Sequence, residues 1–133
     1  MPDNVEIAKR ANAAFNARDF DAFFEVLAPD AELVDFANAP DQQRAIKGMD
    51  ALREVWVLWE EAFDELRVEI SEYSSVGEFV ISAAHWRGQG RESGISIDVR
   101  QFDLYEFRDG KVVALMLGFK TRQEALEVAG LEA

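Results

Sequence analysis

The chain of 133 residues has no cysteine and a single histidine. The absence of cysteine excludes disulfides, thiolate nucleophiles and cysteine-ligated metals, and one histidine is too few for a histidine-rich metal site. We therefore expect no metal and no cofactor. No apolar run reaches about 18 residues, and the N-terminus lacks the basic and apolar segments of a signal peptide. These absences predict a cytoplasmic protein without membrane contact.

Positive charge is also scarce, with 14 basic against 26 acidic residues and a net charge of -12. Nucleic acid and anionic lipid are bound mainly through clustered Lys and Arg, so we expect neither as a partner. Apolar residues are plentiful instead: they make up 49% of the chain and include 10 Phe. This amount is enough for one core, so residues 1–133 are predicted to form a single domain.

Three helices are predicted in the first half of the chain. Asp3 and Glu6 form a capping box before the first one, and Asp19 is an N-cap for a second, short helix that ends at Pro29. Gly48 opens a third helix. The apolar stripe of this third helix consists of Leu52, Val55, Trp56, Trp59, Phe63 and Leu66.

Strand patterns occupy most of the remaining sequence. The predicted strands are 31–36, 67–76, 79–89, 95–108 and 112–119. Asp109-Gly110 marks a tight hairpin turn, Thr121 begins a short C-terminal helix, and the long polar loop Ala37–Lys47 is a candidate lid. Three N-terminal helices packed on a curved antiparallel sheet, with a short C-terminal helix, make an α+β fold.

Asp103 is the most informative candidate residue. It lies in the middle of an apolar strand face, whose alternate residues are Ile95, Ile97, Val99, Gln101, Asp103, Tyr105 and Phe107. Asp35 ends the first strand on the same face as Leu33. We expect these two carboxylates to point into one apolar cavity, where burial raises the pKa of at least one of them. Such a pair is typical of general acid–base sites.

Structural roles for the same residues stay open. Asp103 is equally compatible with a buried structural acid that accepts a hydrogen bond from Tyr73, Tyr105 or an arginine. Asp35 is equally compatible with a strand-end carboxylate that caps the following loop. His85 on a neighbouring strand is either a proton shuttle or a core or interface histidine.

Several segments resemble the NTF2-like superfamily, in its SnoaL-like and ketosteroid-isomerase-like branch. They are Ala13–Asp21 (AAFNARDFD), Pro29–Leu33 (PDAEL), Gly48 before the long helix, and Tyr105–Val113 (YEFRDGKVV). The resemblance implies a cone-shaped domain with a pocket between the long helix and the sheet. The superfamily includes isomerases, cyclases, dehydratases, hydrolases and domains without catalysis.

The resemblance also implies roles for individual residues. Asp35 matches the catalytic base of ketosteroid isomerases, and Asp103 matches the neutral acid that donates to the enolate oxygen. Ala11 stands where the family has its oxyanion tyrosine, which argues against steroid isomerisation. In the predicted last strand, the stretch Leu115–Gly118 lacks the acid that related epoxide hydrolases need. Cyclases that use aldol chemistry fit best, with His85 as a helper.

These observations predict a pocket for a small apolar molecule, in an isomerase or cyclase that acts by proton abstraction on a carbonyl-bearing substrate. The alternatives are a binding pocket without catalysis and a dimerising domain with a filled interior. The expected substrate-binding residues are Asn12, Phe15, Trp56, Trp59, Gln101 and Tyr105.

A homodimer is expected through the outer face of the sheet. The strand pattern assigns Phe102 and Leu104 to that face, together with Val80 and Trp86 of the neighbouring strand. Members of the resembled family commonly pair sheet to sheet, which points the same way.

Overall fold

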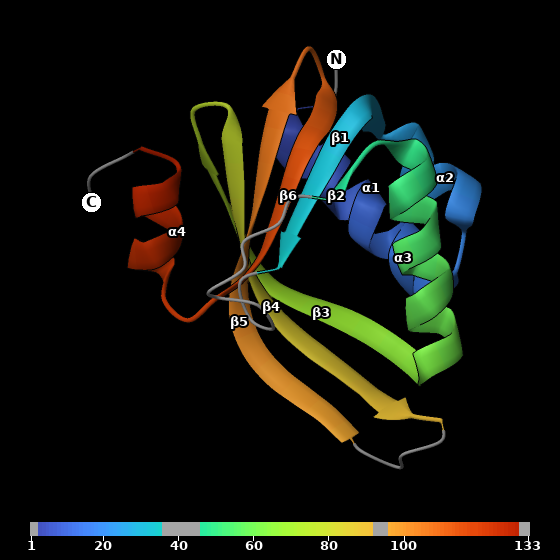
Figure 1. Cartoon of the computed structure of the whole chain (residues 1–133). Helices are drawn as coiled ribbons and strands as arrows, with labels where there is room; N and C mark the ends of the chain where they lie inside the picture. Colours follow the sequence, from blue (N-terminus) through green and yellow to red (C-terminus); the bar gives the residue numbers. More distant parts are fainter. Residues whose placement is uncertain (1–2, 36–45, 92–95, 131–133) are drawn as a thin grey trace.

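The computed structural model describes residues 3–35, 46–91 and 96–130 (Figure 1). Its elements in chain order are α1 Asn4–Ala17, α2 Phe20–Glu25, β1 Leu27–Asp35, β2 Ile46–Lys47, α3 Met49–Ala62, β3 Phe63–Val76, β4 Phe79–Gly90, β5 Ser96–Arg108, β6 Lys111–Phe119 and α4 Arg122–Val128. The predicted α+β class, with three helices in the first half and a short helix at the end, is confirmed. None of the described helices has the length and apolar character needed to span a bilayer.

Local sequence signals set several element ends as predicted. The Asp3 carboxylate accepts from the backbone N–H of Glu6 at 2.9 Å and caps α1. The side chains of Asp19 and Thr121 cap α2 and α4 in the same way. Between β5 and β6, Asp109 and Gly110 both have positive φ, as the predicted tight turn requires.

The six strands form one curved sheet in the order β2-β1-β6-β5-β4-β3. The pairs from β3 to β6 are antiparallel, as the hairpin pattern predicted, and β2 pairs antiparallel with β1. In contrast, β1 pairs with β6 in parallel, so the predicted antiparallel pairing holds for every strand pair of the described sheet except this one. These two strands are far apart in sequence, and no hairpin fixes their relative direction.

The boundary between α3 and β3 lies earlier than the sequence pattern predicted. Phe63 has extended backbone angles, with φ -127° and ψ 142°, so the helix ends before it. Glu65 has positive φ in an irregular segment of β3, and Leu66 is buried beyond it. Because of this irregularity, the Phe63 and Leu66 side chains both face the core. Their spacing therefore resembles a continuation of the helix.

Two other predicted boundaries shift around the first strand. β1 begins at Leu27, so Pro29 lies within this strand, in a segment where the pairing with β6 is irregular. Of the predicted loop Ala37–Lys47, residues 46–47 form β2. The remainder of that loop, and with it the predicted lid, lies outside the described residues.

The two faces of the sheet are covered by different helices (Figure 1). α1, α2 and α3 pack on the inner, concave face and enclose the main core, whereas α4 packs on the outer face over a smaller cluster. Val80 and Trp86 pack on the inner side, while Phe102 and Leu104 lie in the cluster that α4 covers. The four residues therefore do not form the shared outer patch that we expected, and the homodimer stays a prediction.

Side-chain hydrogen bonds fix α1 over the inner face. The Asn16 amide donates to the Val68 carbonyl at 2.8 Å and accepts from the Val68 N–H at 2.9 Å. The Arg18 guanidinium, just beyond the helix, donates to the backbone carbonyls of Phe15 and Leu66. These bonds join α1 to β3 and determine the distance between the helix and the sheet.

We expect Asn16→Leu to lower the free energy of unfolding by roughly 2 kcal/mol, because it leaves two buried backbone groups of Val68 without partners. Urea denaturation measures this loss. The matched control is Asn12→Leu, one turn earlier, since the Asn12 amide makes no hydrogen bond with any described residue. Equal stability of the two variants would contradict the proposed role of Asn16.

Candidate functional site

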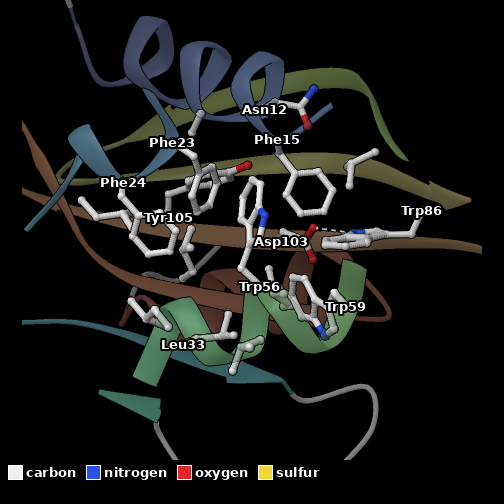
Figure 2. Close-up of a pocket in the computed structure, with 17 residues that line it drawn as sticks. Asn12, Phe15, Phe23, Phe24, Leu33, Trp56, Trp59, Trp86, Asp103 and Tyr105 are labelled. Atoms are coloured by element: carbon white, nitrogen blue, oxygen red, sulfur yellow. Dashed lines mark hydrogen bonds between the residues drawn. The ribbon is translucent and has the colours of Figure 1, made fainter. Parts of the chain in front are cut away.

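A cavity of about 70 Å³ lies between the three N-terminal helices and the inner face of the sheet (Figure 2). This volume has room for several water molecules or for a few atoms of an organic molecule. Most of its wall is apolar, and Asn12 and Asp103 are the polar exceptions together with the phenol of Tyr105. The aromatic residues of the wall are Phe15, Phe23, Phe24, Trp56, Trp59, Trp86 and Tyr105.

The Phe15 ring lies at the centre of the aromatic wall. Its centroid is 5.3 Å from that of Trp56, 6.2 Å from Trp59 and 5.8 Å from Trp86. All three contacts are edge-to-face, the arrangement that the charge distribution of aromatic rings favours. The chain has only these three tryptophans, so its intrinsic fluorescence reports on this cavity.

Asp103 is 2% exposed, as its place on the apolar strand face predicted. Its Oδ2 accepts from the indole N–H of Trp86 at 2.9 Å, which Figure 2 shows. Its Oδ1 accepts from the Gln101 amide at 2.8 Å and from the backbone N–H of Gly118 at 3.1 Å. N–H donors favour the ionised carboxylate, and so they oppose the cost of burying its charge.

Tyr105 extends into the same cavity from β5. Burial raises the pKa of its phenol well above the ordinary value, and the negative charge of Asp103 and nearby Tyr73 raise it further. The Ser82 hydroxyl opposes this rise in part, although it makes no hydrogen bond of normal geometry with the described residues. Tyr105 therefore stays neutral at physiological pH and keeps its O–H as a donor.

The structure places His85 away from the cavity. Along β4 the buried inward residues Val80, Ser82 and Ala84 lead to Trp86, so His85 points to the opposite face. There its Nε2 lies 2.5 Å from Asp98 Oδ1, and this hydrogen bond lowers the pKa of the Asp98 carboxyl. The expected help of His85 in proton transfer is not supported, because the sheet separates it from Asp103.

Most of the other candidates line the cavity. They are Asn12, Phe15, Trp56, Trp59 and Tyr105. Gln101 is not part of the wall and holds Asp103 in place instead. Ala11 is buried in the wall and offers no donor there.

Asp35 is described only in its backbone. It is the last residue of β1 and pairs in register with Leu117, which lines the cavity. Its side chain lies outside the described part of the structure, so its expected contact with the Asp103 cavity stays a prediction. Among the residues that are described, no group of three or more His, Cys, Asp or Glu side chains is arranged to hold a metal ion.

Trp86 belongs to this site, although the sequence pattern assigns it to the outer face. Its ring lines the cavity and its indole N–H binds Asp103. The signal lies in the register between β4 and β5, which places Ser82 opposite Asp103 and hence Trp86 on the inner face. That register is a property of the strand pair, and the pattern of either strand alone does not specify it.

We expect Trp86→Phe to make Asp103 protonate at a higher pH than in the wild type, because the variant removes one N–H donor and keeps an aromatic ring. NMR titration of the ¹³C-labelled carboxyl measures this change. Trp59→Phe is the matched control, since the Trp59 indole does not bind Asp103. A Trp86→Phe titration identical to that of the wild type would show that this hydrogen bond does not stabilise the ionised form.

Several known proteins are similar to this chain. It shares 20% identity and a TM-score of 0.79 with an NTF2-like protein of unknown function from Burkholderia pseudomallei, with 98% of each chain covered. A protein with a ketosteroid isomerase-like fold from Catenulispora acidiphila has 18% identity and a TM-score of 0.75, with 95% of this chain and 93% of that one covered.

A putative SnoaL-like polyketide cyclase from a Jannaschia species has 23% identity and a TM-score of 0.73, with 85% of this chain and 82% of that one covered. These likenesses confirm the NTF2-like fold. No curated protein matches the sequence. The family model of the SnoaL-like domain matches residues 8–115, which is most of the chain, and the protein therefore belongs to the SnoaL-like domain family.

Proposed function

We propose that the chain binds a small, mainly apolar, carbonyl-bearing molecule in the cavity and transfers a proton on it, as an isomerase or a cyclase does. The observation that carries this proposal is the Asp103 carboxylate, which is 2% exposed and lines an aromatic cavity. A carboxylate held in one orientation beside a bound molecule is suited to general base catalysis.

The proposed reaction begins when the carboxylate takes a proton from the carbon next to the carbonyl group. The electron pair of the broken C–H bond forms an enolate, and the carboxyl group now carries the proton. In an isomerase the proton returns to another carbon of the same molecule. In a cyclase the enolate carbon attacks a second carbonyl, a C–C bond forms, and the new alkoxide takes up the proton.

We assign the role of proton acceptor to Asp103, because its N–H donors favour the ionised form. Asp35 is proposed as the second proton-transfer group, since its backbone ends β1 beside Leu117 of the cavity wall. Acid–base sites often combine two carboxyl groups in different protonation states. Tyr105, neutral at physiological pH, adds an O–H donor in the same wall.

The cavity size limits the part of the substrate that it encloses. A dry cavity of about 150 Å³ accommodates benzene, so the present cavity of about 70 Å³ encloses only a few atoms. Several residues of the wall, among them Asn12, Trp59 and Trp86, are only half-buried. We therefore propose a small substrate, or a larger one whose remainder extends past these half-buried residues.

The similar proteins support a function on small molecules. The Catenulispora acidiphila structure is a complex with trimethylamine, and the Jannaschia protein is described as a putative polyketide cyclase. Both are under 25% identical to this chain, so their ligand and activity enter here only as part of the proposal.

We expect the protein to accelerate exchange of the α-hydrogens of cyclohexanone for deuterium in D₂O, measured by NMR. Asp103→Asn should reduce this acceleration by about 100-fold or more, because general base catalysis typically contributes at least that factor. Asp35→Asn tests the second carboxyl group. The His85→Gln variant should catalyse this exchange at the wild-type rate, since His85 lies on the opposite face of the sheet.

The controls separate chemistry from folding and from binding. Tryptophan fluorescence shows whether each variant keeps its aromatic wall. Exchange by a folded Asp103→Asn variant at the wild-type rate would contradict the role of Asp103. Binding of cyclohexanone without any exchange would instead support the second candidate, a ligand-binding pocket without catalysis, which the largely apolar wall favours.

A further inference from the structure

Two asparagines one turn apart on α1 have different surroundings. Asn16 uses both ends of its amide to bind the Val68 backbone, at 2.8 and 2.9 Å, and so joins the helix to β3. Asn12 is half-buried, lines the cavity and makes no hydrogen bond with any described residue. Of these two asparagines, Asn16 joins the helix to β3, whereas Asn12 makes no such contact with the described residues.

The Asn12 amide is a polar group in a largely apolar wall. Because Asn12 is half-buried and not bound to another described residue, its amide is available to a molecule in the cavity. The other residues that α1 contributes to the wall are Ala11 and Phe15, which offer no polar side chain. Asn12 is therefore the position on this helix where a polar side chain meets the cavity without a structural hydrogen bond.

Figure 2 shows how Asn12 and Asp103 are placed relative to the aromatic rings. Asn12 comes from α1 on the helical side of the cavity, and Asp103 comes from β5 on the sheet side, with Phe15 drawn between them. Because both residues line the cavity, a bound molecule can contact the amide from the helical side and the carboxylate from the sheet side. The rest of its surroundings is largely apolar.

The geometry points to Asn12 as the residue that positions the ligand, by donating its Nδ2–H to a carbonyl or hydroxyl oxygen on an otherwise apolar, uncharged molecule. This inference rests on the proposed function, since it needs a small molecule in the cavity. To the proposed function it adds the class of ligand, an uncharged molecule with one carbonyl or hydroxyl oxygen, and the residue that selects this ligand, Asn12. An anionic ligand is disfavoured because Asp103 places negative charge beside the cavity.

The amide is suited to this role because it donates without carrying charge. An uncharged donor binds a neutral oxygen without the desolvation cost of a cation. In the proposed enolisation, the same N–H would bind the oxygen as its negative charge develops. Asn12 would then contact the substrate directly, whereas Gln101 and Trp86 act on it through Asp103.

The test compares cyclohexanone with cyclohexene, which has the same ring size and no oxygen. We expect Asn12→Leu to weaken cyclohexanone binding by about three- to ten-fold, the usual value of one hydrogen bond, and to leave cyclohexene binding equal or tighter. Asn12→Asp, which lacks the N–H donors, should also weaken cyclohexanone binding. Calorimetry or ligand-observed NMR measures each affinity, and cyclohexanecarboxylate should bind more weakly than the ketone.

A direct spectroscopic readout accompanies the affinities. In ¹H–¹⁵N spectra of the wild type, cyclohexanone should shift the side-chain amide signals of Asn12 and leave those of Asn16 in place. Asn12→Leu should unfold at nearly the wild-type urea concentration, unlike Asn16→Leu. This combination separates ligand contact from a structural role.

Several outcomes would overturn the inference. They are an unchanged affinity for cyclohexanone in folded Asn12→Leu, an equal loss for cyclohexanone and cyclohexene, equally tight binding of the carboxylate, and no binding of cyclohexanone to the wild type. The proposed proton transfer and the proposed role of Asn12 can be refuted independently of each other. Binding that depends on Asn12 without deuterium exchange would refute proton transfer alone, and exchange that does not depend on Asn12 would refute only this inference.

Discussion

The hydrogen bonding of Asp103 is the interaction on which the candidate site depends. A carboxylate in an apolar cavity is stable only when N–H groups or cations compensate its lost hydration. Here Trp86 of β4, Gln101 of β5 and the Gly118 backbone of β6 provide N–H groups. The carboxylate thus joins three neighbouring strands, and its orientation follows from the pairing of the sheet.

The cavity results from the way in which the helices are held above this sheet. Asn16 and Arg18 bind backbone groups of β3, and the edge-to-face rings around Phe15 fill the space next to Asp103. The edge-to-face contacts stabilise the arrangement of the rings that line the cavity. The fold therefore combines an aromatic, largely apolar wall with two polar side chains from different elements, Asn12 of α1 and Asp103 of β5.

Membership of the SnoaL-like family leaves the chemistry of this chain open, since function resides in particular side chains rather than in a fold. Ala11 lines the cavity where the resemblance places a tyrosine donor, and it supplies no hydrogen bond. Among the donors that the lining residues do carry are the Asn12 amide and the Tyr105 phenol. A reaction in this pocket would therefore use another donor arrangement than the one the resemblance implies.

The sequence by itself determined the features that depend on neighbouring residues. Asp3, Asp19 and Thr121 cap their helices, Asp109-Gly110 makes the hairpin turn, and period-two alternation placed Asp103 among buried residues. Only the tertiary structure decided the parallel pairing of β1 with β6, the end of α3 at Ala62, and the inward position of Trp86 with His85 on the opposite face. These features depend on contacts between residues far apart in sequence, where register and strand irregularities override local periodicity.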